Sequence, residues 1–412
     1  MTDRGRRRAA IVAVLSFGVA ACTAATPPSP DRESRVPNAT TQPSVPVSPS
    51  PSQAPRTVRP SSSRIDLDIG QIDPEWLWPM LDFASDSYGI IWSSGVLDGP
   101  DGHTAPDLWR YVPGRARPDL LWRNPDRDRQ LAKIGGDTDV WAFAEISSGQ
   151  EGWWKLWLLS EADGSLRMLD SKAEDSSVPS LVPSFDVDAG RIAWTVFHRG
   201  AQPGSATSQL WMAHAPDWAP RLLAERDAAD HALWLPSLYG DRLAYVEVTI
   251  GADPSLDVRH VMLLDLSSPT TDAVQLDTSG NATMPVITDD GVVWKEPEVG
   301  FAMFNWGTLH RYAFDTGKVS GVRMMPQVDV NYPSGGGRFL AAWGANTSVF
   351  TVHDLHRGRS RLIELYDNTV DSIVRPHLAG DLLVWMHRTE AGAGVSPPAP
   401  LEYAWLPERG RD

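Results

Sequence analysis

The sequence predicts an all-β fold built from one unit that is repeated along most of the chain. Three observations carry this prediction. An aromatic residue near the end of a short apolar strand recurs at intervals of about 50 residues, a Gly-containing turn precedes most of these strands, and 18 of the 412 residues are Trp. Four short strands per repeat, arranged in tandem, are the pattern of a β-propeller. The repeats favour seven blades, with six or eight as alternatives, because the repeat boundaries shift by a few residues with the choice of anchor.

The chain begins with a segment that predicts export. Four arginines within Met1–Ala10 precede an apolar run from Ala9 to Ala21. This run is shorter than the roughly 20 residues that span a bilayer. A basic segment followed by a short apolar run is typical of a secretory signal peptide. The choice between general and twin-arginine export stays open.

The end of this apolar run carries a lipidation motif. Val19-Ala20-Ala21-Cys22 resembles the cleavage box of bacterial lipoproteins, and Cys22 is the single cysteine of the chain. The resemblance implies that residues 1–21 are a lipoprotein signal peptide and that Cys22 carries acyl chains, of which stable anchoring needs more than one. An ordinary signal peptide with an incidental cysteine is the alternative. A single cysteine also excludes an intrachain disulfide.

The segment after Cys22, up to residue 63, predicts a disordered stalk. It contains ten prolines, many Ser and Thr, and almost no large apolar residues, so it cannot bury enough surface to fold. Fully extended at ~3.1 Å per residue, such a stalk reaches on the order of 100 Å. The expected organisation is a signal peptide over 1–21, lipidated Cys22 with its stalk over 22–63, and a propeller over 64–412.

The charge of the chain narrows the class of partner. The formal net charge is −15, and because residues 1–21 carry +3, the remainder carries −18. An acidic body argues against nucleic acid as a partner and against anionic membranes as a partner of the folded part. We therefore expect contact with the membrane through the lipid anchor only. We expect no cofactor, because neither a P-loop nor a dinucleotide fingerprint occurs.

The body repeats one phrase of strand, turn and strand. The second strand of each repeat carries an aromatic anchor: Trp92, Phe143, Trp194, Tyr245, Trp294, Trp343 and Trp385. Six first strands have an opening proline: Pro79, Pro183, Pro236, Pro285, Pro333 and Pro376. Most turns contain or adjoin a glycine: Gly89, Gly190, Gly240, Gly291, Gly337 and Gly380. We expect proline where no ladder donor is needed, glycine where a hairpin needs positive φ, and the aromatic anchors in the wedges between blades.

Outer strands complete each repeat. A third strand such as Lys155-Leu-Trp-Leu-Leu follows after a variable gap, and a turn such as Asp163-Gly164 leads to a fourth strand. Together with the Gly-Asp turn and the aromatic strand, these outer strands resemble the TolB-type, WD40-like propeller repeat over nearly all of 64–412. The resemblance implies the propeller fold and leaves the function open, because such propellers serve different roles.

The seventh repeat ends early. After Trp385 and a gap comes Leu401-Glu-Tyr-Ala-Trp-Leu406, followed by a polar tail. The segment from Ser63 to Ile69 alternates polar and apolar residues at period two and has no blade of its own. We expect it to provide the missing outer strand of the seventh blade, because a closed ring removes exposed strand edges.

One face of the ring is the candidate binding surface. Strand direction alternates within a blade, so the connections between second and third strands lie on the same face as those between blades. The long, variable connections all fall on this long-loop face, where function tends to reside. The candidate binding residues are large side chains in these loops or at the mouth of the central channel: Trp78, Trp153, Trp154, Trp234, Met284, Phe301, Phe304, Trp306, Tyr332 and Arg375. Local packing is the alternative for each of them.

Spacing singles out no catalytic or metal-binding residues. No Gly-x-Ser-x-Gly elbow occurs, and His353 and His356 are three apart, so on a strand they would point to opposite faces. The expected function is a lipoprotein on the extracytoplasmic side of the cell membrane, whose propeller is a non-enzymatic binding platform for cell-envelope proteins. The alternative is a propeller that binds carbohydrate or another cell-wall ligand, as a glycan hydrolase or lyase with a carboxylate pair hidden among many acids.

Overall fold

The fold is a ring of seven four-stranded antiparallel sheets. The computed structural model describes residues 69–72, 80–85, 89–97, 104–125, 129–147, 153–172, 181–202, 205–253, 256–268, 272–297, 307–322, 331–343, 349–356, 359–364, 372–388 and 401–406. Its named elements are 28 β-strands in seven sheets. The prediction of seven four-stranded blades is confirmed. No helix in these ranges is long and apolar enough to cross a membrane.

The blades follow one another along the chain. Blade 1 holds β2 (Met80–Ser85), β3 (Ile90–Leu97), β4 (Thr104–Tyr111) and β5 (Asp119–Trp122). Blade 2 holds β6 (Arg129–Asp137), β7 (Val140–Ser147), β8 (Trp154–Ser160) and β9 (Leu166–Lys172). Blade 3 holds β10 (Ser184–Asp188), β11 (Arg191–Arg199), β12 (Ala206–His214) and β13 (Arg221–Asp227). Blade 4 holds β14 (His231–Tyr239), β15 (Arg242–Thr249), β16 (Val258–Asp265) and β17 (Val274–Gln275).

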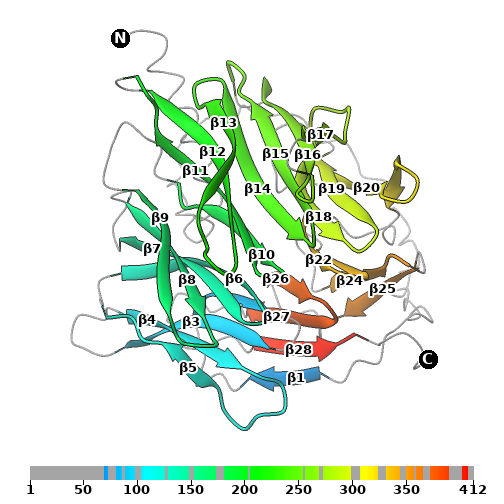
Figure 1. The fold of residues 1–412 in the computed structure, drawn as a ribbon. Helices are drawn as coiled ribbons and strands as arrows, with labels where there is room; N and C mark the ends of the chain where they lie inside the picture. Colours follow the sequence, from blue (N-terminus) through cyan, green and yellow to red (C-terminus); the bar gives the residue numbers. More distant parts are fainter. Residues whose placement is uncertain are drawn as a thin grey trace, which may run out of the picture.

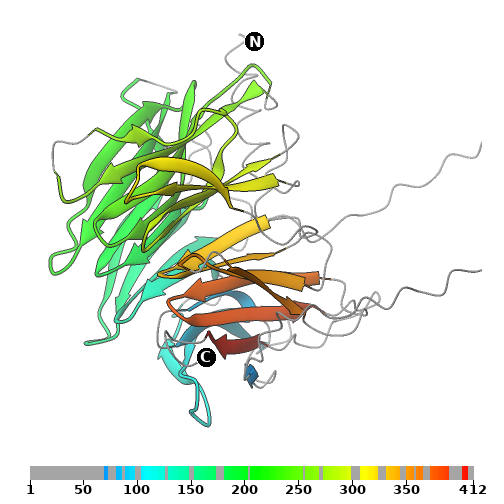
Figure 2. The same ribbon diagram turned by 90° about the vertical axis from the view of Figure 1, so that its right-hand side faces the viewer.

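The remaining blades have the same order. Blade 5 holds β18 (Thr283–Thr288), β19 (Gly291–Pro297), β20 (Gly307–Ala313) and β21 (Lys318–Val322). Blade 6 holds β22 (Asn331–Gly336), β23 (Phe339–Trp343), β24 (Val349–Asp354) and β25 (Arg359–Glu364). Blade 7 holds β26 (Ser372–Ala379), β27 (Leu382–Arg388), β28 (Leu401–Trp405) and β1 (Ile69–Ile72). The first strands β6, β10, β14, β18, β22 and β26 gather near the middle of Figure 1, with the fourth strands outside them. In Figure 2 the green blades 3 and 4 lie above the orange and red strands of blades 6 and 7.

The start and the end of the propeller share blade 7. β1 pairs antiparallel with β28, with Ile69 opposite Ala404 and Ile72 opposite Leu401. The predicted closure by an N-terminal strand is therefore confirmed. The pairing strand is Ile69–Ile72, and residues 63–68 of the predicted strand lie outside the described residues. Ile72 explains this register, since it is 2% exposed and packs with Trp92 at the seam between blades 7 and 1.

The aromatic anchors fill the wedges between blades. Six of them are at most 2% exposed: Trp92, Phe143, Trp194, Tyr245, Trp294 and Trp385. Trp194, for example, packs with Leu156 and Leu158 of blade 2, and burying such a ring removes a large apolar area from water. The prediction that these side chains form the core between blades is confirmed for these six. Trp343 lies in β23, and its side chain is outside the described residues.

Only some of the turn glycines have the predicted conformation. Gly190, Gly240, Gly337 and Gly380 adopt positive φ, between 55° and 69°. Gly291 does not, and a Cβ there would collide with the carbonyl oxygen of Tyr312 in the third strand. The prediction that Gly291 is present because the turn needs a positive φ is therefore wrong. The blade needs glycine at this position because the neighbouring strand approaches so closely.

The prolines of the first strands also differ from the prediction. Pro183 directly precedes β10, as expected, and Pro79 lies outside the described residues. The other four lie inside strands, at register shifts that interrupt the ladder: Pro236, Pro285, Pro333 and Pro376. The prediction that these four prolines are the first residues of their strands is therefore wrong. A β-bulge tolerates proline because it leaves a backbone group outside the ladder.

Candidate functional site

The structure places the predicted binding residues unevenly. Cys22 and four candidates lie outside the described residues: Trp78, Phe301, Phe304 and Trp306. Tyr332 is placed in β22 and Arg375 in β26 by the backbone alone. The other four candidates are described in full. They are Trp153, Trp154, Trp234 and Met284.

Trp153 and Trp154 lie side by side at the start of β8 but in different environments. Trp154 is 1% exposed and packs between blades 2 and 3 against Leu156, with its ring 6.1 Å from that of His198. It offers no surface to a ligand, which corrects its place among the binding residues. Trp153 is half-buried, and the Lys155 ammonium lies 5.6 Å from its ring centroid. Trp153 is thus the accessible aromatic of this pair.

Trp234 and Met284 occupy equivalent bulges in neighbouring blades. Trp234 is half-buried against the core between blades 4 and 5, and the strand register shifts directly after it. Met284 is 9% exposed and adopts φ 53° at the bulge of β18. Left-handed backbone is uncommon for a residue with a side chain. The burial favours packing for Met284, and its part in ligand binding stays a prediction.

The first strands are tied together around the axis by polar side chains. Four residues at one equivalent position each accept a hydrogen bond from a backbone N–H of the next blade, and we call them the latch residues: Asp186, Ser237, Ser334 and His377. Asp186 Oδ2 accepts from Leu238 at 2.7 Å, and Ser237 Oγ from Ile287 at 3.1 Å.

The other two latches form the same kind of bond from blade 6 to blade 7 and from blade 7 to blade 1. Ser334 Oγ accepts from the N–H of Leu378 at 2.9 Å, and His377 Nδ1 accepts from that of Ser85 at 3.3 Å. The last bond joins blade 7 to blade 1. Each latch satisfies a backbone donor that points away from its own sheet, which would otherwise be costly to bury.

The sequence held a partial signal for these latches. In blades 4, 6 and 7 the latch is the residue directly after the bulge proline, as in Pro236-Ser237 and Pro376-His377. Asp186 has no such neighbour. Blades 1, 2 and 5 carry a nonpolar residue at this position, so no strict repeat marks it.

A lysine adds charge beside the latches. Lys133 Nζ in β6 donates to the carbonyl oxygen of Phe185 at 3.0 Å and lies 4.8 Å from the centroid of its ring. Burial raises the pKa of Asp186 to about 6, although the Leu238 N–H and the Lys133 charge oppose the shift. Burial also lowers the pKa of His377 to about 4, and Lys133 reinforces this shift. Lys133 of blade 2 thus influences a carboxyl group of blade 3 and an imidazole of blade 7.

A second set of ties lies nearer the turns between first and second strands. Asp137 Oδ2 accepts from the N–H of Ala189 at 2.6 Å, and Asp188 Oδ2 accepts from that of Gly240 at 2.6 Å. The Tyr239 hydroxyl donates to Asp289 of the next blade. Burial raises the pKa of Asp188, and the neighbouring Asp137 charge adds to the effect.

The described acids that join the first strands are therefore bound to the backbone of the next blade. A glycosidase pair needs two carboxyl groups that are free to face a substrate, whereas Asp137, Asp186 and Asp188 each bind backbone of the next blade. Within the described ranges, no three His, Cys, Asp or Glu side chains gather as metal ligands. His353 is 7% exposed in β24, while His356 Nε2 lies 3.8 Å from Asp289.

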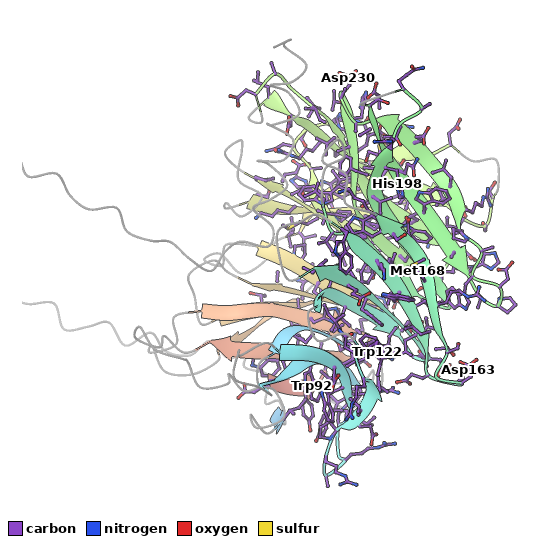
Figure 3. The ribbon with its side chains drawn as sticks, turned by 90° about the vertical axis from the view of Figure 1, so that its left-hand side faces the viewer. Trp92, Trp122, Asp163, Met168, His198 and Asp230 are labelled. Atoms are coloured by element: carbon purple, nitrogen blue, oxygen red, sulfur yellow. The ribbon has the colours of Figure 1, made fainter. Side chains whose placement is uncertain are left out.

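The long connections remain as the variable surface. The turn between β10 and β11 is two residues long, whereas twelve residues, 389–400, separate β27 from β28. The prediction that all long connections fall on one face is wrong, because on the opposite face seven residues separate β4 from β5 and eight separate β16 from β17. In Figure 3, Asp163 marks the β8–β9 turn at the lower right, and Asp230 marks the connection between blades 3 and 4 at the top. Because strands alternate in direction, all second-to-third connections lie with the connections between blades on the long-loop face. Trp153 belongs to this face.

Comparison with known proteins supports the architecture. No protein-family model matches the chain, and no curated protein matches it. The propeller domain of the trilobed protease from Pyrococcus furiosus, which has an open velcro topology, aligns with a TM-score of 0.54 at 8% identity, over 80% of this chain and 96% of that one. The acylaminoacyl peptidase from Pyrococcus horikoshii aligns with a TM-score of 0.54 at 9% identity, over 79% of this chain.

These identities show the fold alone. The chain aligns with 50% of the length of the acylaminoacyl peptidase. It also differs from the open velcro arrangement of the trilobed protease domain, because β1 completes blade 7 by pairing with β28. The chain is a seven-bladed β-propeller that resembles the propeller domains of peptidases.

Proposed function

We propose that the protein is a lipoprotein on the extracytoplasmic side of the cell membrane, and that its TolB-like propeller is a non-enzymatic binding platform for a cell-envelope protein. The basic segment, the apolar run and Cys22 support the anchor. The Pro-rich stalk supports a body held at a distance from the bilayer. An anchored body of this kind meets its partners at the envelope.

One observation carries the binding role of the propeller. The described polar groups nearest the axis are used to join blades, as with Asp186 to Leu238 and His377 to Ser85. The connections on the long-loop face vary in length from blade to blade: eight residues separate β15 from β16, and twelve separate β27 from β28. A ring fixed by such ties presents these connections with little reorganisation on binding. That combination suits recognition of a partner surface better than chemistry at the axis.

The charge of the chain suggests the character of the partner. With 52 acidic and 37 basic residues, the chain has a formal net charge of −15. Complementary charge speeds encounter between proteins and excludes wrong partners. We therefore propose a partner that presents a basic surface, with Trp153 as an aromatic contact at the rim of the long-loop face.

Two experiments test this function. Replacing Cys22 with Ser is expected to move the protein from the membrane to the soluble fraction, and the anchor is refuted if the variant stays bound as firmly as wild type. Affinity purification from crosslinked envelopes is expected to recover one protein in stoichiometric yield. Recovery of cell-wall glycan in place of a protein would favour the carbohydrate-binding alternative and refute a protein partner.

A further inference from the structure

A small cavity opens between blades 3 and 4 at the end of the blades opposite the long-loop face. Its volume is about 220 Å³, and it is lined by Arg191, Met212, His214, Ala219, Arg221 and Leu266. It shares no residue with the candidate binding face. Its polar lining is entirely basic, in a chain with an excess of acids.

Strand pairing brings the basic residues to one side of blade 3. Arg191 of β11 is directly opposite His214 of β12, and Met212 of β12 is opposite Arg221 of β13. His214 and Met212 are two residues apart, so their side chains share a face of the sheet. That face packs against blade 4, where Leu266 follows β16 and is fixed by a hydrogen bond from its N–H to the carbonyl oxygen of Asp241 at 2.8 Å.

The cavity has an apolar floor and a basic rim. Met212 is 7% exposed and Leu266 is half-buried, whereas His214 and Arg221 are exposed. The loop that carries Ala219 forms the remaining wall. It is held by a hydrogen bond from the Trp218 N–H to the His214 carbonyl oxygen at 2.8 Å and by Arg167, which donates to the Asp217 carbonyl oxygen.

The basic groups differ in how far they are neutralised. Arg191 donates to Asp241 at 2.6 Å, so its charge is balanced and its orientation fixed. Arg221 forms no ion pair with any residue that the structure describes. His214 Nδ1 donates to the carbonyl oxygen of Ala215 at 2.7 Å, which leaves its Nε2 without a partner in the described part of the chain.

We propose that this cavity binds a carboxylate carried on a short apolar group. One unbalanced guanidinium matches a monoanion, and the planar fork of arginine fits the two oxygens of a carboxylate. Met212 and Leu266 would cover the apolar part. The volume is below the ~300–1,000 Å³ of drug-sized sites, so the ligand is a small acid or the terminal residue of a peptide.

Binding of hexanoate to the full-length protein, measured by calorimetry, tests the site. Hexanamide has the same apolar chain and no charge, so it is expected not to bind. Arg221→Ala is expected to weaken hexanoate about 10- to 100-fold, the range for loss of a charged hydrogen bond. Arg115→Ala is the matched control, because Arg115 is an exposed arginine of blade 1 that pairs with Asp119 at 2.6 Å; it is expected to leave the affinity unchanged.

An N-acetylated dipeptide ending in Leu distinguishes the two sources of the carboxylate. Tighter binding than hexanoate supports a peptide terminus, and weaker binding supports a free acid. A melting temperature of Arg221→Ala equal to that of wild type establishes that the variant is folded. The proposal is overturned if neither acid binds saturably, if hexanamide binds as well as hexanoate, or if the folded Arg221→Ala variant keeps wild-type affinity.

Discussion

Replacement of Asp186 and of His377 is expected to change the pH dependence of stability in opposite directions. Burial raises the pKa of Asp186 from 3.8 to about 6. The folded state therefore holds this proton more tightly than the unfolded state does. The stabilisation is fully present below pH 3.8 and is lost as the pH rises to about 6. At 1.36 kcal/mol per pKa unit, this difference in pKa between the folded and unfolded states contributes roughly 3 kcal/mol to the free energy of unfolding.

His377 acts in the opposite sense. Burial lowers its pKa from 6.5 to about 4, so the unfolded state binds the proton more tightly. Its stabilisation is fully present above pH 6.5 and is lost as the pH falls to about 4, again by roughly 3 kcal/mol. In the wild-type protein the changes of the two contributions with pH nearly cancel between pH 4 and 6.5.

Single substitutions separate the two contributions. Asp186→Asn removes the carboxyl group, so the variant is expected to lose stability relative to wild type as the pH falls from 6 to 4. His377→Asn keeps an acceptor for the Ser85 N–H and removes the imidazole, so it is expected to gain relative to wild type over the same range. Urea unfolding followed by Trp fluorescence measures both differences. Curves for either variant that run parallel to wild type from pH 4 to 7 would refute the account of the axis.

Three further predictions concern the ring itself. Trp294→Ala is expected to lower the free energy of unfolding by about 3–5 kcal/mol, as for other buried aromatic residues, and denaturant unfolding checks it; a loss below 1 kcal/mol contradicts its place in the wedge. Deleting residues 69–72 is expected to lower the melting temperature, because blade 7 loses its outer strand; an unchanged calorimetric transition contradicts closure by β1. Gly291→Ala is expected to lower the free energy of unfolding by about 1–3 kcal/mol, because the added carbon overpacks the blade. Gly321→Ala is the control and is expected to leave stability unchanged, because no atom lies within 4 Å of the added carbon. Equal melting temperatures for the two variants would contradict the close approach of the neighbouring strand to Gly291.

The fold was predictable because the strand-turn-strand unit that forms each blade is repeated along the chain. Each wedge needs one large apolar side chain, so residues such as Trp194 and Trp294 recur at a nearly constant interval. The prediction that the prolines open their strands was wrong, since a sequence pattern does not distinguish a strand's first residue from a β-bulge. Pro236 lies within a register shift that only the paired strand reveals.

The candidate sites were less predictable, because they depend on neighbouring blades. Asp186 is one acid among many in the sequence, and its role depends on the Leu238 N–H, 52 residues away. The basic cavity is also hidden, since Arg191 and Arg221 come together through pairing with β12. Large aromatic side chains signal burial and binding equally well, so Trp154 and Trp153 could be separated only by their exposure.

Site-specific photocrosslinking in intact cells tests the central proposal most directly. A photoreactive amino acid at position 153 samples the long-loop face, and one at position 163, in the exposed β8–β9 turn, samples the opposite end of the same blade. We predict a discrete adduct with one envelope protein from position 153 and none from position 163. Adducts from position 163 alone, or from neither position, would contradict a binding platform on the long-loop face.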